Sequence, residues 1–135
     1  MRKFLIVSHG ALAGGIRSAL ELITGPAPDV VVLQAYVDEN KPVEEEIAEV
    51  LAGADTEWVV FTDLLGGSVT NQVVRVAAGL VAPERIHVVA GVNLPLVIEV
   101  VMADAELPVA EVLAEAIGRA REQLVYVNEL LTHND

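Results

Sequence analysis

The residues best suited to chemistry lie in two short segments of the chain. His9 follows the apolar run 4–7, and Asp63 comes shortly before Gly66-Gly67-Ser68. Placed beside His9, the Asp63 carboxylate would accept the proton of one imidazole nitrogen and leave the other nitrogen with an exposed lone pair. Asp63 would also stabilise the positive charge that develops when that lone pair attacks an electrophile. We therefore predict that His9 is a nucleophile and that Asp63 orients it.

The segment Gly66-Gly67-Ser68 predicts an anion-binding cradle next to the histidine. It opens a stretch with helical spacing of apolar residues, and the free backbone N–H groups at the start of a helix favour a bound anion. The glycines allow a bulky group to approach closely, and the Ser68 hydroxyl would either cap the helix or bond an oxygen of the anion. A nucleophilic histidine, an orienting aspartate and an anion cradle together describe a phosphoryl acceptor that forms a phosphohistidine.

Short β-branched runs alternate with longer helical stretches along the whole chain. This alternation predicts an α/β fold with a doubly wound, mainly parallel four-stranded sheet in the order 2-1-3-4 and helices on both faces. The expected strands are 4–7, 30–37, 58–62 and 86–90, and the expected helices are about 12–23, 42–51, 68–78, 95–103 and 108–123. The segment 124–127 also has strand character, but nothing local indicates which sheet edge it joins.

The predicted strand order explains how the two chemical segments meet. Ligands of doubly wound sheets bind at the carboxyl ends of the strands, where the winding direction reverses. Strands one and three are neighbours in this order, so His9 and Asp63 should end side by side across about 5 Å of sheet. The loop Gly91-Val92-Asn93 after strand four should reach the same edge.

Each of these residues also has a purely structural interpretation. A lone histidine at a strand end is more often structural than catalytic, Asp63 is equally suited to capping a turn, and most Gly-Gly-Ser segments are turns. Asn71 is expected to make a polar contact to the loop one helical turn back, and Asn93 to hold its own loop by side-chain–backbone bonding. His87 is expected to be a structural histidine within strand four, and His133 to be solvated. The conjunction of the segments at one sheet edge favours the chemical interpretation.

Composition excludes several other classes of function. The 135 residues include 8 Lys plus Arg against 20 Asp plus Glu, and the net charge of −12 argues against binding to nucleic acid or to an anionic membrane surface. The absence of cysteine excludes disulfides, a thiol nucleophile and Cys-based metal sites. No apolar stretch is long enough for a secretory signal or a membrane span. We expect one cytoplasmic domain spanning 1–135.

Three motifs resemble those of one family, and together they cover most of the chain. Phe-Leu-Ile-Val-Ser-His-Gly at 4–10 resembles the phosphorylation-site strand of the IIA component of the mannose/fructose/sorbose family of the bacterial sugar phosphotransferase system. Asp-Leu-Leu-Gly-Gly-Ser-Val-Thr-Asn at 63–71 and Ala-Gly-Val-Asn-Leu-Pro-Leu-Val at 90–97 resemble the second and third motifs of that family. The chain departs from the pattern at Val69, where many relatives have proline, and at Leu65, where an aromatic residue is frequent.

The resemblance implies a specific role for each matching residue. His9 would accept a phosphoryl group from the phosphocarrier protein HPr and pass it to a IIB component, with the IIC and IID membrane components acting further along the pathway. Asp63 would orient His9, while Ser68 and the backbone of Gly66-Gly67 would hold the phosphoryl oxygens. The family uses neither a metal nor a nucleotide cofactor. The resemblance also implies a homodimer in which the last strand, here 124–127, is exchanged between subunits. Such an exchange closes an open sheet edge.

Three other functions remain open from the sequence. A receiver domain phosphorylated on Asp63 would need Mg²⁺ held by acidic residues at the end of strand one, where this chain has Ser8-His9-Gly10. The phosphotransfer subunit of a dihydroxyacetone kinase shares the predicted fold and the histidine chemistry. A non-catalytic regulatory module would keep the anion-binding pocket without transferring a phosphoryl group.

Overall fold

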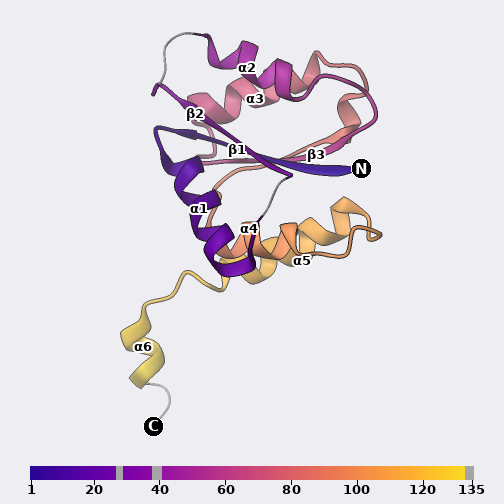
Figure 1. The fold of residues 1–135 in the computed structure, drawn as a ribbon. Coiled ribbons are helices and arrows are strands. Elements are labelled where there is room, and N and C mark those ends of the chain that lie inside the picture. The colour runs from indigo at the N-terminus through magenta and orange to yellow at the C-terminus, as the bar shows by residue number, and fades with distance from the viewer. Residues whose placement is uncertain (27–28, 38–40, 133–135) are drawn as a thin grey trace.

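The fold is a four-stranded parallel sheet in the order β2-β1-β3-β4 (Figure 1). The computed structural model describes residues 1–26, 29–37 and 41–132. Within them the strands are β1 (Arg2–His9), β2 (Val30–Ala35), β3 (Glu57–Thr62) and β4 (Ile86–Val89), and every neighbouring pair is parallel. The predicted α/β fold class and strand order are therefore confirmed.

Helices cover both faces of this sheet. Figure 1 shows α2 (Val43–Val50) and α3 (Ser68–Ala78) on one face, and α1 (Leu12–Thr24), α4 (Leu94–Val101) and α5 (Val109–Arg121) on the other. A short 3-10 turn, η1 (Pro83–Arg85), leads into β4. No helix in the described ranges combines the length and the apolar character that crossing a membrane requires.

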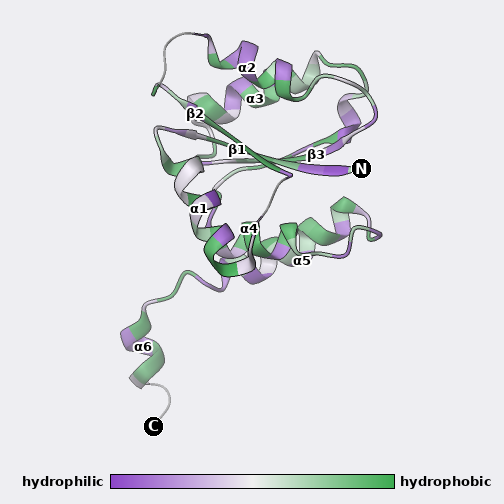
Figure 2. Cartoon of the chain, viewed as in Figure 1, coloured by the Kyte–Doolittle hydropathy of each residue, from purple (hydrophilic) through white to green (hydrophobic). Residues whose placement is uncertain are grey.

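Two apolar cores lie on opposite faces of the sheet because side chains of a strand alternate in direction. Phe4 and Ile6 of β1 pack into the core under α1, α4 and α5, while Leu5 and Val7 pack into the core under α2 and α3. Figure 2 shows hydrophobic residues along the strands and mixed colours on the covering helices. Burial on both faces accounts for the nearly all-apolar run in β1. His9 lies at the end of this buried run, where β1 leaves the sheet.

The second strand is shorter than predicted. It ends at Ala35 rather than Val37, because the backbone at Tyr36 turns into the left-handed region with φ of 67°. A bulky residue in this conformation ends an extended strand and sends the chain away from the sheet. The predicted polar turn that follows includes residues 38–40, which lie outside the described residues.

The predicted strand at 124–127 is absent from the single chain. Residues 124–126 have no regular structure, and the helix α6 (Val127–Thr132) follows them. Figure 1 shows this segment leading away from the sheet and its covering helices. Strand propensity is expressed only when a segment pairs with a neighbouring strand, and residues 124–126 make no such pairing in the single chain. His133 lies outside the described residues.

Candidate functional site

His9 and Asp63 meet where β1 and β3 end. His9 is the last residue of β1 and Asp63 follows β3, its direct neighbour in the sheet. One carboxylate oxygen, Asp63 Oδ2, accepts two hydrogen bonds from the histidine, from the backbone N–H at 2.7 Å and from Nδ1 at 2.8 Å. The same residue is therefore held at its backbone and at its ring, which fixes the direction of the imidazole.

The surroundings of Asp63 keep its carboxyl group ionised. Its side chain is only 8% exposed, and this burial by itself raises the pKa. The hydrogen bonds from the His9 backbone and ring and the charge of the imidazole outweigh burial, so the pKa of Asp63 lies below its ordinary value. An ionised carboxylate only accepts hydrogen bonds, so the proton of the contact lies on Nδ1. In the neutral ring, Nε2 then carries the lone pair.

Ser68 faces the Nε2 side of the ring. Its Oγ lies 3.3 Å from Nε2, and the His9 side chain is 42% exposed to solvent. Of the two roles considered for Ser68, helix capping is not found, because the N-cap of α3 is Gly67 and no side chain caps it. The hydroxyl instead lies next to Nε2 of His9.

The two glycines shape the loop that brings Ser68 there. Gly66 has φ of +77°, which side chains rarely permit, and a Cβ at Gly67 would lie 3.2 Å from the Leu64 carbonyl oxygen and 3.8 Å from His9 Cε1. The Gly67 N–H already donates to the Leu64 carbonyl at 3.1 Å. Within the described ranges, the N–H groups of residues 68–70 find no acceptor, so these are the donors that α3 offers beside Nε2.

The two asparagines hold loops and do not contact His9. Asn71 Nδ2 lies 3.5 Å from the Gly66 carbonyl oxygen, a weak contact within the loop before α3. Asn93 caps α4 by accepting from the Leu96 N–H at 2.9 Å, and its Nδ2 donates to the Ala120 carbonyl at 3.4 Å. The predicted side-chain–backbone bonding of Asn93 is present. The loop after β4 reaches the same edge, where Val92 N–H donates to the Thr62 carbonyl at 3.0 Å.

One residue at the site was missed from the sequence. The Tyr36 hydroxyl lies 3.0 Å from Ser68 Oγ, and its ring centroid lies 5.5 Å from that of His9, with the planes tilted by 40°. The predicted strand ran through this position, which hid it. The predicted strand order could have indicated this residue. Strand two lies directly beside strand one, so the residues at its carboxyl end lie at the same sheet edge as His9.

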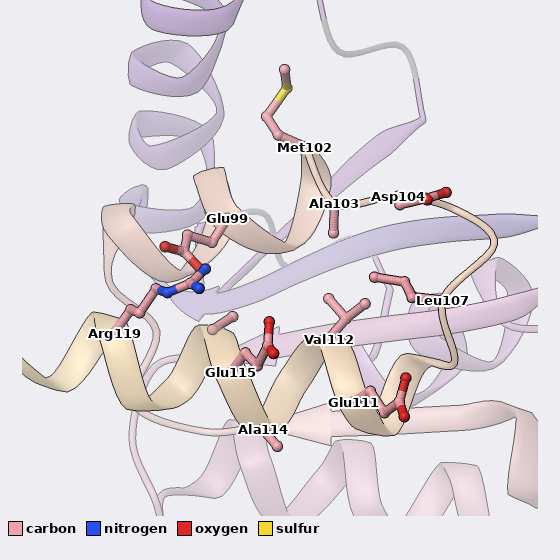
Figure 3. Close-up of a pocket in the computed structure, with 11 residues that line it drawn as sticks. Glu99, Met102, Ala103, Asp104, Leu107, Glu111, Val112, Ala114, Glu115 and Arg119 are labelled. Atoms are coloured by element: carbon pink, nitrogen blue, oxygen red, sulfur yellow. The ribbon is translucent and has the colours of Figure 1, made fainter.

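Two cavities of the described residues are not lined by the histidine. One of about 590 Å³ lies between α4 and α5, and its lining includes Glu99, Met102 and Leu107. Figure 3 shows Arg119 facing Glu99 there, and Arg119 Nη1 lies 3.3 Å from Glu99 Oε2. A second cavity of about 560 Å³ lies beside β4. Neither is lined by His9, Asp63 or Ser68, and the His9 side chain is 42% exposed to solvent.

No metal-binding cluster accompanies the site in the described residues. Nowhere in residues 1–26, 29–37 and 41–132 do three or more His, Asp or Glu side chains gather in a way that would hold a metal ion. His87, the other described histidine, has its Nε2 3.0 Å from Glu57 Oε2. This pair joins β4 to β3, which agrees with the structural role expected for His87.

Comparison with known proteins identifies the family. The family model described as "PTS system fructose IIA component" (EIIA-man) matches residues 3–117. The chain belongs to this family. Its members are IIA components of sugar phosphotransferase systems (PTS), so the chain has a phosphotransfer role in such a system. Family membership implies, in general terms, interaction with HPr and with a IIB component. No curated protein matches the sequence.

Solved structures agree with this assignment. A candidate phosphoenolpyruvate-dependent sugar PTS permease from Klebsiella pneumoniae is 33% identical, with a TM-score of 0.85 over 96% of this chain and 93% of that one. The PTS component EIIA from Streptococcus agalactiae is 28% identical, with a TM-score of 0.79 over 96% and 99% of the two chains. The mannose/sorbose-specific IIA subunit from Enterococcus faecalis, at 23% identity and a TM-score of 0.80 over 93% of each chain, has the same fold.

The contacts at Gly67 lead to a stability prediction. Gly67→Ala places a methyl group against the Leu64 backbone and replaces a favourable N-cap residue, so we expect the free energy of unfolding to fall by about 1 kcal/mol. Gly15→Ala is the matched control, because it lies in α1 with open space around its Cβ position. That change should raise the free energy of unfolding by about 0.5–1 kcal/mol. Urea titration measures both, and a stabilised Gly67→Ala variant would contradict the argument.

Proposed function

We propose that His9 accepts a phosphoryl group from phospho-HPr on Nε2 and donates it to a IIB component during sugar uptake. The observation that carries the proposal is the Asp63 Oδ2 contact with Nδ1 at 2.8 Å, because it leaves the lone pair of the neutral ring on the solvent-facing nitrogen. In the transfer, this lone pair forms a bond to phosphorus. The bond from phosphorus to the donor atom breaks, and its electron pair stays with the donor.

The charges around His9 support this reaction. If Nδ1 keeps its proton while Nε2 carries the phosphoryl group, the ring is positively charged. The ionised Asp63 carboxylate, accepting hydrogen bonds at 2.7 and 2.8 Å, balances that charge. Ser68 Oγ and the free N–H groups of residues 68–70 provide donors for the phosphoryl oxygens. Gly66 allows the turn that brings the start of α3 to the ring. Gly67 has no side chain, which leaves space beside the ring.

The open surface around His9 suits a protein donor and a protein acceptor. A small substrate is usually enclosed in a concave pocket, whereas Nε2 here is reached from solvent. Exposed apolar side chains lie close in sequence to the site residues, including Leu12, Leu64 and Leu65. These features favour phosphoryl transfer between protein surfaces.

Phosphorylation with purified components tests the assignment. Incubation with phosphoenolpyruvate, Enzyme I and HPr should add one phosphate that is acid-labile and stable in base. His9→Ala should abolish the labelling. The matched control is His87→Gln, which changes a histidine bonded to Glu57 near the start of β4 and should be labelled like the wild type. Asp63→Ala should stay folded and lose transfer rate by a factor of about 10²–10³, because the charge on the ring is then no longer balanced.

Each alternative outcome has a distinct meaning. Unchanged labelling of His9→Ala would contradict the proposal. A base-sensitive phosphate lost in an Asp63 variant would indicate an aspartyl phosphate. Failure of the wild type to accept phosphate from several HPr proteins would favour the regulatory module, and efficient transfer onward to a dihydroxyacetone kinase subunit would favour that system.

We also propose that two copies of the chain form a dimer by exchanging the segment that follows α5. The open edge of β4 is bordered by an apolar groove of about 560 Å³, whose lining includes Val88, Leu113 and Ile117. Leu124 lies at this groove, is 90% exposed, and begins the segment that leads away from the rest of the chain (Figure 1). An unpaired strand edge beside an apolar groove favours the addition of a strand from a second copy.

Truncation tests the exchange. The full chain should have twice the mass of one chain in light scattering coupled to size-exclusion chromatography. Ending the chain after Gln123 removes the exchanged segment, and this variant should be monomeric. Ending it after Thr132 removes only three terminal residues and should leave the dimer intact. A monomeric full chain, or a dimeric variant ending at Gln123, would contradict the exchange.

A further inference from the structure

Tyr36 is placed over the candidate site by an unusual backbone conformation. The residue follows β2, whose Ala35 is paired with His9 of β1. Its φ of 67° is rare for a bulky side chain, and such conformations concentrate at functional sites. The tyrosine ring lies 5.5 Å from the imidazole, within the range of an aromatic contact, yet the residue is 57% exposed. Burial of the ring therefore does not explain its position.

The hydrogen-bond directions at the site form one continuous chain. The Asp63 carboxylate accepts from Nδ1–H, so Nε2 of the neutral ring is an acceptor. The Ser68 hydroxyl, 3.3 Å away, then directs its single proton to Nε2. With that proton committed, Ser68 Oγ accepts from the Tyr36 hydroxyl at 3.0 Å. Tyr36 is thus the donor at the outer end of a chain that runs to the lone pair of the nucleophile.

Phosphorylation of Nε2 must rearrange this chain. Once the lone pair forms the bond to phosphorus, the Ser68 hydroxyl loses its acceptor on the ring. The phosphoryl oxygens then lie where the Ser68 and Tyr36 hydroxyls converged, and each hydroxyl has one proton to donate. A hydrogen bond to a charged oxygen is about twice as strong as the neutral bond that it replaces. The rearranged contacts therefore favour the phosphorylated protein.

We propose that the Tyr36 hydroxyl is a ligand of the phosphoryl group, which holds Ser68 on Nε2 before transfer and donates to a phosphoryl oxygen after it. This inference rests on the proposed function of His9 and adds a residue to it. The hydroxyl is the feature that matters, because a phenylalanine would keep the ring contact with the imidazole and lose only the donor. Tyr36 thereby sets how strongly the chain retains phosphate relative to its protein donor.

The test compares the wild type with Tyr36→Phe in the full chain. The equilibrium constant for phosphoryl exchange with HPr is measured by ³¹P NMR from the amounts of each phosphorylated protein. In the wild type, phosphorylation replaces the neutral hydrogen bond of the Tyr36 hydroxyl by one to a charged oxygen, which favours the phosphorylated state. Removal of this hydroxyl should therefore shift the equilibrium toward phospho-HPr by about five- to tenfold. Ser18→Ala, which removes an exposed hydroxyl from α1, should leave the equilibrium unchanged.

The equilibrium constant separates phosphoryl binding from contact with HPr. A tyrosine that served only to dock HPr would change the KM for phospho-HPr and the transfer rates in both directions equally, with no change in equilibrium. An equilibrium equal to that of the wild type would therefore overturn the inference while leaving His9 as the acceptor. Failure of the wild type itself to accept phosphate would instead count against the proposed function. Circular dichroism and thermal unfolding should show that Tyr36→Phe retains the fold.

Discussion

The candidate site depends on one contact, between a carboxylate at the end of one strand and a histidine at the end of its neighbour. Asp63 Oδ2 accepts from both the backbone N–H and Nδ1 of His9, so it fixes the ring and determines which nitrogen is free. This contact requires that β1 and β3 lie side by side and end at the same level. The parallel sheet and its two apolar cores provide that alignment.

The remaining groups are arranged around the free nitrogen. Ser68 reaches Nε2 because the loop before α3 turns at Gly66 and passes close to the ring at Gly67. Tyr36 reaches Ser68 because β2 stops at Ala35 and the chain turns sharply there. The carboxyl ends of β1, β2 and β3 therefore position His9, Tyr36 and Asp63 at the same edge of the sheet, and the His9 ring stays exposed to solvent.

The sequence predicted the parts of this arrangement that are encoded locally or by topology. The apolar runs predicted the strands, and the order 2-1-3-4 then predicted that His9 and Asp63 would meet, which they do at 2.8 Å. Tyr36 was not predicted, because the expected strand 30–37 ran through it and a left-handed backbone at a tyrosine has no signature in residue type. The segment 124–127 has strand character in the sequence, but strand propensity is expressed only through pairing, and in the single chain this segment pairs with neither edge of the sheet.

The central claim is that Asp63 holds the Nδ1 proton and so directs the phosphoryl group to Nε2. It is tested most directly by long-range ¹H–¹⁵N NMR on the phosphorylated protein with ¹⁵N-labelled histidine, in which the phosphorus-coupled ring nitrogen of His9 is identified. Coupling of ³¹P to Nε2 and a proton on Nδ1 are the expected result. Coupling of ³¹P to Nδ1 would contradict it, because that atom would then be free of Asp63.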